Sequence, residues 1–505
     1  MSSVPDVSQI TDPELLRQIV TLQEREIQRL HQRLAQLCTQ LAQLQGKQGS
    51  KQLELELLRL QEQLAAANRR MFGPSSEKRP GPQTTPPPPA PLPKGHGPTE
   101  QPQLPRLTKR HELLPCDRQC PFCHLEMSEM RGQTEDSEEI TVVERRFLLV
   151  TNQKQKYRCS CNAAILTAPG PEKLIPGGRY SLEFAVEVAL QKYSFHMPLE
   201  RQARRMLSEG LRITRQTLWD QLYPLAALLT PSYQELRKKV LEPFVVHMDE
   251  TPWKLLTSRP SKTWQVWCIS SENGTYYHLD PHRSAAVAQE ILGGFAGVLV
   301  TDGLQVYQTV ARGSPQIMLV FCWAHVRRKF LDAEAAYPQC AQALDLIGAL
   351  YQVERNAPRV RGLSPSEAAE ALQLRAQLRA TQSKPLLEQL WDWTEEQICL
   401  PRSSLRGALD YLRSLWPGLT RFVDDPRIPL DNNAAERELR AVVLGRKNHY
   451  GSKSERGTQV AAVLYSLIET ARQLGVDERQ YLLSAARFAM ANPGGALLPH
   501  ALLLS

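Results

Sequence analysis

Three acidic residues, Asp249, Asp302 and Glu436, stand where a metal-dependent reaction at phosphorus could use them. Asp249 and Asp302 each follow a short apolar run, and Glu436 lies near the start of a helical pattern. Carboxylate oxygens are ligands that Mg²⁺ and Mn²⁺ prefer. Two such ions, about 4 Å apart, can activate the attacking oxygen and stabilise the leaving oxygen when a phosphodiester bond is displaced. The pattern therefore predicts a magnesium or manganese site for phosphodiester cleavage and strand transfer.

Other acids and simpler roles compete with this interpretation. An aspartate at the end of a strand often forms a turn or caps a helix, and a helical glutamate is often a surface charge. Glu250, Asp431 and Glu438 lie near the chosen residues in the sequence and compete with them. His247 fits a core histidine equally well. The spacing alone leaves these alternatives open.

A multidomain α/β arrangement would bring the first two acids together. A strand is predicted from residue 244 to the carboxylate of Asp249, followed by a second and third strand, a helix that ends at Gly293, a fourth strand, a second helix and a fifth strand. The four later strands are predicted at residues 263–269, 275–279, 298–301 and 317–321. The order βββαβαβ is that of a ribonuclease-H-like fold, in which the first and fourth strands are neighbours. Asp249 and Asp302 would then project from adjacent strand ends.

The third acid, Glu436, is predicted in the first turns of a helix that runs to about Leu444. Asp431 or Asn432 can cap this helix. Leu439 lies on the same helical face as Glu436, so the carboxylate is expected at a partly buried edge. A buried carboxylate needs a partner or a metal ion, which agrees with the proposed site.

Basic residues flank the three acids in the sequence, in a chain of 505 residues with a net charge of +8. Guanidinium and ammonium groups suit phosphate oxygens, so nucleic-acid phosphates are the predicted partner. Cys322 and His325 could face each other across a helical turn, and we interpret them as packing near the site rather than as metal ligands. The two basic clusters consist of Arg327, Arg328 and Lys329, and of Arg437, Arg440, Arg446, Lys447, Lys453 and Arg456.

Two close pairs of cysteines predict a structural zinc site. Cys120 and Cys123 form one pair, and Cys159 and Cys161 form the other, with a predicted hairpin between them. Four thiolates in two pairs suit tetrahedral Zn²⁺. Cys116 or His124 could replace one of the four, and a set of reduced cysteines without metal is the alternative.

The first part of the chain predicts a coiled coil and a linker. Apolar residues alternate steps of three and four, which favours self-association through a heptad seam, although one amphipathic helix on its own chain is the alternative. The seam consists of Ile27, Leu30, Leu34, Leu37, Leu41 and Leu44. A basic motif with Arg69 and Arg70 follows, and the proline-rich residues 79–108 predict an extended linker.

Residues 180–240 have helical patterns with the rhythm of a helix-turn-helix. The first helix is predicted from Leu199 to Leu207 and the second from Thr214, its N-cap, to Leu225. Arg215 and Gln216 would then lie at the start of a recognition helix, where they suit base edges or phosphates. The pattern by itself fits an ordinary helical hairpin better.

The predicted domain plan follows from these segments. Residues 364–367 form a capping box with proline at the first helical position, within a region that is predicted to be a helical insertion. The plan is a coiled coil with basic motif (1–78), a linker (79–108), a zinc-binding domain (109–168), a helical DNA-binding region (169–240), the catalytic domain in two parts (241–335 and 426–478) around the helical insertion (336–425), and a tail (479–505).

At these motifs the chain resembles the insertion-sequence-sixty-six type of bacterial DDE transposases, over most of its length. The resemblance implies Asp249, Asp302 and Glu436 as the catalytic triad, magnesium as cofactor, terminal-inverted-repeat DNA and target DNA as substrates, and accessory proteins encoded beside the transposase. The most specific motifs are His247-x-Asp249-Glu250-Thr251-Pro252, Thr301-Asp302-Gly303, Cys322-Trp323-Ala324-His325-x-Arg327-Arg328-Lys329-Phe330, Asp431-Asn432-Asn433-x-x-Glu436-Arg437 and Gly445-Arg446-Lys447-Asn448.

Two other functions fit the same motifs. One is a DNA-binding regulator derived from a transposase that no longer cleaves, and the other is a non-specific nuclease of the same fold. The sequence has no apolar run long enough to span a bilayer and begins without a secretory pattern, so a cytoplasmic location is expected.

Overall fold

The computed structural model describes residues 147–158, 165–257, 262–360 and 362–503, together with positions 29, 33, 36 and 122. The chain divides into two units, residues 1–72 with 146–505 and residues 73–145, and every element below belongs to the first unit. Several predictions fall outside the described residues and stay predictions: the heptad seam, Arg69 and Arg70, the proline-rich linker, and Cys120, Cys123, Cys159 and Cys161.

No described helix combines the length and the apolar character that crossing a bilayer requires.

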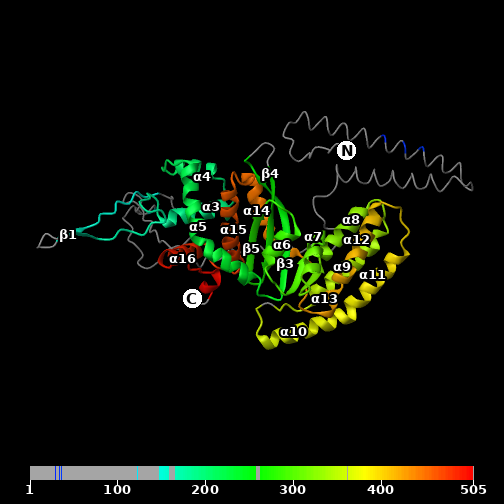
Figure 1. The fold of residues 1–505 in the computed structure, drawn as a ribbon. Helices are drawn as coiled ribbons and strands as arrows, with labels where there is room; N and C mark the ends of the chain where they lie inside the picture. Colours follow the sequence, from blue (N-terminus) through cyan, green and yellow to red (C-terminus); the bar gives the residue numbers. More distant parts are fainter. Residues whose placement is uncertain are drawn as a thin grey trace, which may run out of the picture. The chain divides into compact units, whose positions relative to one another are not determined.

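A five-stranded mixed sheet lies at the centre of the described part (Figure 1). Its strands are β3 (Val245–Leu255), β4 (Lys262–Ser271), β5 (Gly274–Asp280), β6 (Gly297–Thr301) and β7 (Ile317–Phe321), in the order β5-β4-β3-β6-β7. The first three strands are antiparallel, and β6 is parallel to both β3 and β7. The prediction that the first and fourth strands are neighbours is therefore confirmed.

The first strand is longer than predicted, and the prediction that it ends at Asp249 is wrong. β3 does not end at Asp249 but continues to Leu255, paired with β4 over its whole later part. Its pairing with β6 stops at His247, which lies opposite Val300. Asp249 therefore lies inside a strand, just beyond the point where its parallel neighbour ends. The antiparallel pairing explains the extra length, because β4 satisfies the backbone of β3 beyond the last parallel pair.

Helices pack around the sheet (Figure 1). The connections β5–β6 and β6–β7 are the predicted helix α6 (Ala285–Leu292), which Gly293 ends in a left-handed conformation, and α7 (Gln305–Gly313). The long helices α5 (Arg215–Val240) and α15 (Glu455–Gln473) pack against β5, and α14 (Asn433–His449) packs against β3 and β4. Helices α3 (Leu182–Tyr193), α4 (Leu199–Ser208) and α16 (Glu478–Ala491) contact α5, and β1 (Lys156–Arg158) pairs with β2 (Ile165–Thr167).

The second helix of the predicted helix-turn-helix is twice as long as expected. Thr214 is its N-cap, as predicted, and its side chain accepts a hydrogen bond from the Thr217 N–H at 3.2 Å. The helix then continues past Leu225 to Val240, with Pro224 and Pro231 inside it. Its apolar side is buried along the whole length, so tertiary packing outweighs the local cost of the two prolines.

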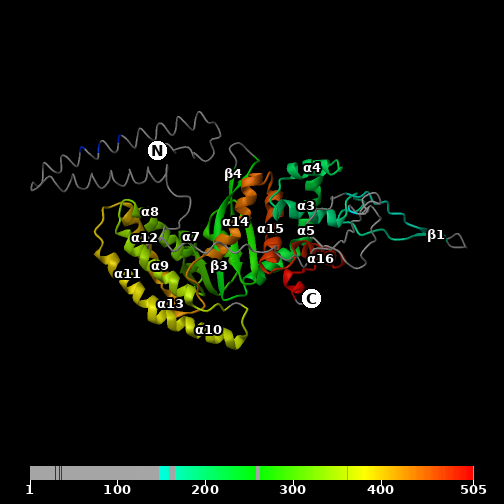
Figure 2. The same ribbon diagram turned by 180° about the vertical axis from the view of Figure 1, so that it is seen from behind.

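All elements between α8 (Trp323–Glu334) and α14 are helical in the described residues, as predicted for the insertion. They are α9 (Cys340–Asn356), α10 (Pro365–Leu378), the π-helical turn η3 (Arg379–Ser383), α11 (Lys384–Glu396), α12 (Ser404–Leu419) and α13 (Arg421–Asp424). The capping box of Ser364 and Glu367 is present. Helix α12 packs against α8 and β7, which attaches this group of helices to one edge of the sheet (Figure 2).

The buried Arg379 joins the insertion to the segment that leads into α14. Its guanidinium makes a two-pronged ion pair with Glu354, at 2.7 and 2.8 Å, and its side chain is fully buried. The same guanidinium donates to the carbonyl oxygens of Phe422, Asp425 and Ile428 at 2.6–3.0 Å. The insertion therefore fixes the path of the chain shortly before Glu436.

Replacing Arg379 with alanine is expected to destabilise the protein by about 3–5 kcal/mol, because Glu354 and three carbonyl oxygens would lose their shared donor. Chemical denaturation would measure the loss. Arg406→Ala is the matched control, because Arg406 makes an exposed pair with Asp410 on α12. Equal stability of the two variants would contradict the anchoring role of Arg379.

Candidate functional site

Asp249 and Asp302 lie side by side at the end of the parallel pairing between β3 and β6. His247 pairs with Val300, and the two aspartates come two residues later, Asp249 within β3 and Asp302 directly after the end of β6. One carboxylate oxygen from each of Asp249, Glu250 and Asp302 lies within 4.8 Å of the other two. The structure therefore brings together the first two acids that the sequence analysis selected, with a third acid beside them.

Backbone groups orient both aspartates. Asp249 Oδ1 accepts from the Glu250 N–H at 2.8 Å, and Asp302 Oδ1 accepts from the Leu304 N–H at 2.9 Å. Between Asp302 and Leu304, Gly303 has a φ of +87°, and a Cβ there would lie 2.6 Å from Leu415 Cδ1. Only glycine fits this turn without displacing a neighbour, so Gly303 helps to set the direction of the Asp302 side chain.

Glu250, the competing acid, is already occupied by partners. Its side chain is 1% exposed, and Oε1 accepts from Arg283 Nε at 2.9 Å. Its other oxygen, Oε2, accepts from the hydroxyl of Tyr307. Both oxygens of Glu250 are thus engaged, whereas Asp249 and Asp302 each use Oδ1 for one backbone N–H. This difference favours the two aspartates as metal ligands.

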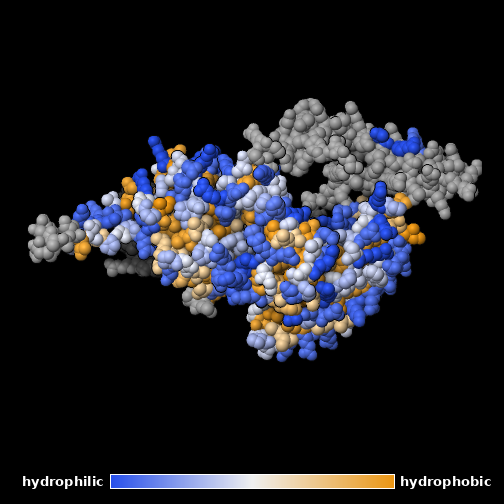
Figure 3. Space-filling view, viewed as in Figure 1, coloured by the Kyte–Doolittle hydropathy of each residue, from blue (hydrophilic) through white to orange (hydrophobic). Residues whose placement is uncertain are grey.

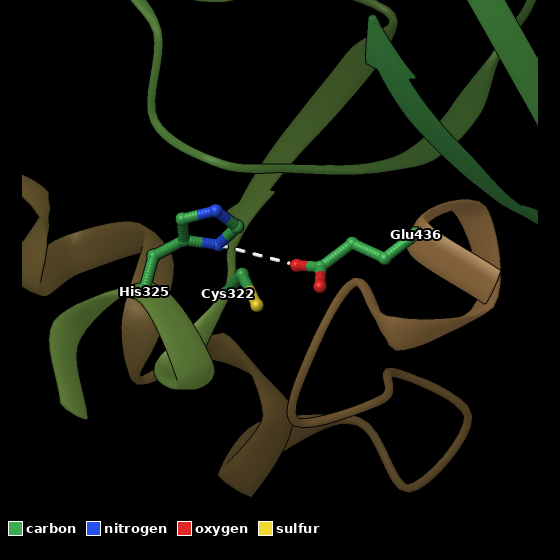
Figure 4. Close-up of side chains that lie close together, drawn as sticks. All are labelled: Cys322, His325 and Glu436. Carbon is green, nitrogen blue, oxygen red and sulfur yellow. Dashed lines mark ion pairs between the residues drawn. The ribbon is translucent and has the colours of Figure 1, made fainter. Parts of the chain in front are cut away.

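Glu436 lies in the first turn of α14 and faces Cys322 and His325 from the start of α8 (Figure 4). Glu436 Oε1 is 3.6 Å from His325 Nδ1, too far for a hydrogen bond. Within the described part of the chain, neither of these two buried atoms has a hydrogen-bond partner. The charge of Glu436 also contributes to raising the pKa of Asp249, so the third selected acid lies within electrostatic reach of the first.

Asn432 fastens α14 to β3 and to α8. It is fully buried, and its amide Nδ2 donates to the Met248 carbonyl oxygen at 3.0 Å. Its Oδ1 lies 3.1 Å from His247 Nδ1, and its backbone N–H donates to the Cys322 sulfur at 3.1 Å. Asn432 is the N-cap residue of α14, one of the two that were predicted, but its amide is used for these contacts and makes no capping bond. The other predicted cap, Asp431, accepts from the Asn433 N–H at 3.1 Å.

The Asn432 contacts also determine the protonation of His247. The Met248 carbonyl can only accept, so the amide N–H group of Asn432 must face it and Oδ1 must accept from His247. His247 therefore carries its proton on Nδ1. Burial lowers the pKa of His247 to about 4, so the ring is neutral at physiological pH. This agrees with the alternative of a core histidine, which here also orients Asn432.

Burial first, and then the charge of Glu250, raise the pKa of Asp249 to about 8, with smaller contributions from Asp302 and Glu436. The carboxylates of Asp249, Glu250 and Asp302 lie close together in a partly buried site, where a bound divalent ion would offset their repulsion. Asp249, Asp302 and Glu436 could hold such an ion, because all three offer the oxygen ligands that Mg²⁺ and Mn²⁺ prefer.

Asp249→Asn is expected to stabilise the metal-free protein at pH 8 by about 1–2 kcal/mol. The folded-state pKa of Asp249 lies above its ordinary value of 3.8. The folded state therefore binds the proton more tightly, and stability is lost as pH rises from about 4 towards 8. Thermal unfolding in excess chelator at pH 5 and pH 8 measures this. If the difference in unfolding temperature between variant and parent does not grow with pH, the pKa of Asp249 is not raised in the folded protein.

The basic residues of the second cluster do not all have the same role. Arg437, Arg440 and Lys447 lie on the exposed face of α14, next to Glu436 in the helix. Arg446 instead donates to Thr251 Oγ1 at 3.2 Å and to the Pro252 carbonyl, so it ties α14 to β3. These contacts leave one basic face on α14 that is open to a polyanion.

Most of the predicted DNA-binding residues of α8 and α5 are also at the surface. Arg328 and Lys329 are exposed on α8 and Arg327 is half-buried there, with Lys329 Nζ 5.5 Å from the centre of the Tyr411 ring. Arg215 and Gln216 are exposed at the start of α5. Their side chains contact Glu200, at 4.0 Å, and Asp220, at 2.8 Å. Neither of these contacts joins Arg215 or Gln216 to the acids of the site.

Two features of this site go beyond the predictions from the sequence. Cys322 and His325 face each other as predicted, and their ligand atoms also lie within 4.8 Å of Glu436, which was not predicted. Asn432 connects three segments, which was not predicted either. The Cys-x-x-His spacing at the start of a helix was a usable signal for the first feature, because it places both side chains near one helix end. The second requires contacts between residues far apart in the sequence.

Known proteins with similar sequences were found for most of the chain. Residues 177–460 match the family described as Transposase IS66 family, and this range contains Asp249, Asp302 and Glu436. The uncharacterized protein y4jD of Sinorhizobium fredii is 30% identical over 400 residues, covering 75% of this chain and 76% of that protein. The uncharacterized protein y4qI of the same organism is 29% identical over 387 residues, covering 72% and 70%. The resemblance drawn from the motifs is thereby confirmed.

Proposed function

Because this chain belongs to the IS66 family of transposases, we propose that it cleaves DNA at the inverted-repeat ends of an insertion sequence and joins those ends to target DNA. The observation that carries this proposal is the placement of Asp249 beside Asp302, with Glu436 within electrostatic reach. The strand order supports the finer assignment of a ribonuclease-H-like catalytic domain. We keep Asp249, Asp302 and Glu436 as its catalytic residues.

In this proposal Asp249, Asp302 and Glu436 hold Mg²⁺ or Mn²⁺. When bound, such ions activate the attacking oxygen and stabilise the leaving oxygen of a phosphodiester. The protein supplies the position of each carboxylate: the register of β3 and β6 sets the two aspartates, and Asn432 sets the start of the helix that carries Glu436. Because these groups are fixed by backbone pairing and buried hydrogen bonds, little reorganisation is needed when substrate arrives.

The exposed basic face of α14 supports a path for DNA past the acids. Arg437, Arg440 and Lys447 would contact backbone phosphates next to the reacting bond, with Arg328 and Lys329 of α8 as further contacts. On the face of the molecule seen in Figure 3, hydrophilic and apolar residues are interspersed, and the outer edge of the insertion is mostly hydrophilic.

Three finer assignments complete the proposal and rest on the sequence and the family. The cysteines Cys120, Cys123, Cys159 and Cys161 hold structural Zn²⁺, the N-terminal heptads form a homo-oligomer, and Arg69, Arg70, Arg215 and Gln216 contact DNA. The domain boundaries given above belong to this proposal, as do accessory proteins of the same element.

Incubating the full-length protein with labelled duplexes that carry the inverted repeats flanking its reading frame tests the function. The expected result is Mg²⁺- or Mn²⁺-dependent cleavage at the ends and joining to a second duplex, with no cleavage of a shuffled duplex. Tight binding to the ends without cleavage in either metal would instead identify a regulator. Cleavage without end preference or joining would identify a non-specific nuclease.

A further inference from the structure

The group formed by Cys322, His325 and Glu436 has ligand types that the aspartates lack. A sulfur, an imidazole nitrogen and a carboxylate oxygen lie within 4.8 Å of one another. Figure 4 shows the side chains of His325 and Glu436 pointing toward each other, with the Cys322 thiol beside them. Glu436 Oε1 and His325 Nδ1 are both buried and are only 3.6 Å apart. Two buried polar atoms that approach without a hydrogen bond leave a place for a shared partner.

Burial raises the pKa of Cys322, so the sulfur is a neutral thiol until a bound ion displaces its proton, and the local structure orients it. Cys322 is the N-cap residue of α8, where the helix dipole favours a negative charge. Its sulfur accepts from the Asn432 N–H at 3.1 Å. A hydrogen bond of this kind orients a metal ligand and stabilises the charge of a thiolate.

We propose that Cys322, His325 and Glu436 form a binding site for a transition-metal ion of the Zn²⁺ type, with the Glu436 carboxylate shared between this ion and the Asp249–Asp302 site. The sulfur and imidazole nitrogen select such an ion over Mg²⁺, which takes oxygen ligands. Three protein ligands leave one tetrahedral position open. Binding releases the thiol proton to solvent.

The shared Glu436 carboxylate would link this site to the proposed catalytic site. Glu436 Oε1 faces His325, which leaves Oε2 for an ion held by the aspartates. Occupancy of one position would therefore affect the other through a single side chain. The shared use of the Glu436 carboxylate rests on the proposed function, whereas binding of an ion by Cys322, His325 and Glu436 does not.

Titration of the full-length protein with Co²⁺ tests the site, because a cobalt–thiolate bond absorbs in the near ultraviolet. The compared proteins are the parent, Cys322→Ser, His325→Ala and the control Cys340→Ser. Cys340 is a buried thiol at the start of α9 and belongs to none of the ligand groups found in the described residues. The zinc cysteines predicted near the N-terminus contribute equally to all four proteins, so they cancel in the differences.

The expected result is that the parent and Cys340→Ser each bind one more equivalent of Co²⁺ than Cys322→Ser. His325→Ala should weaken the binding of that equivalent at least tenfold. Subtracting the spectrum of Cys322→Ser from that of the parent should leave a cobalt–thiolate band, whereas subtracting the spectrum of Cys340→Ser should leave none. Equal stoichiometry and superimposable spectra in all four proteins would overturn the site. If Cys322→Ser does not fold, His325→Ala decides, because His325 is partly exposed. No DNA is present, so a protein that lacks transposase activity can still pass this test, and an active one can fail it.

Discussion

Alanine at Asp249, Asp302 or Glu436 is expected to lower the rate of end cleavage by roughly a thousandfold or more, which corresponds to about 4 kcal/mol of transition-state stabilisation. Each carboxylate would hold a cation on which the displacement depends, and the other two cannot supply the missing oxygen from their fixed positions on β3, directly after β6 or on α14. The initial rate of cleavage on an end duplex, at saturating Mg²⁺ and at Mn²⁺, measures the effect.

Asp410→Ala is the control for these three variants, because Asp410 is an exposed carboxylate on α12 that pairs only with Arg406 among the contacts described. It should cleave at the parent rate, and all four variants should bind the end duplex as the parent does. A triad variant that keeps more than a tenth of the parent rate would remove that residue from the active site. Glu250 would be the first replacement to examine, although Arg283 and Tyr307 occupy both its oxygens.

Asn432→Ala is expected to lower the affinity for Mn²⁺ and the cleavage rate by roughly 10–100-fold, although Asn432 binds neither the ion nor DNA in this account. The substitution removes the hydrogen bonds to Met248 and His247, and with them the tie between β3 and the start of the helix that carries Glu436. Glu436 would then sample several positions relative to Asp249. Calorimetric titration with Mn²⁺ separates this effect from a loss of folding.

Asn433→Ala is the matched control, because the next residue in the chain is exposed and its side chain contacts only Asp431 among the hydrogen bonds described. It should keep the parent affinity for Mn²⁺. If Asn432→Ala binds Mn²⁺ as the parent does but unfolds at a lower temperature, Asn432 stabilises the fold without positioning Glu436. A weakened Mn²⁺ affinity at full folding supports the positioning role.

Local patterns in the sequence were sufficient to predict the sheet and the pairing of its central strands. Short apolar runs marked all five strands, and Gly293 correctly marked the end of α6, because a left-handed residue there favours glycine. The same local reasoning placed Asp249 at a strand end, which was wrong. How far β3 extends depends on its pairing with β4, and single-strand hydrophobicity does not contain that information.

The arrangement around Glu436 could be predicted only in part. The helix and its first-turn acid follow from local sequence, but α14 extends to His449 and not to about Leu444, because its later turns pack on β3 and are tied there by Arg446. The contacts of Asn432 and the partners of Glu250 link residues separated by tens to hundreds of positions. Residue type alone gave no preference between these uses and a simple helix cap or surface charge.

In the proposed function, Asp249, Asp302 and Glu436 hold divalent cations at one place. A crystal structure of the full-length protein soaked in Mn²⁺, with data collected for anomalous scattering of manganese, tests it most directly. We predict an anomalous peak within coordination distance of a carboxylate oxygen of both Asp249 and Asp302, and Glu436 as a ligand of that ion or of a second one beside it. Saturating Mn²⁺ with no peak at the aspartates, or a peak that Glu436 does not reach, would contradict the account.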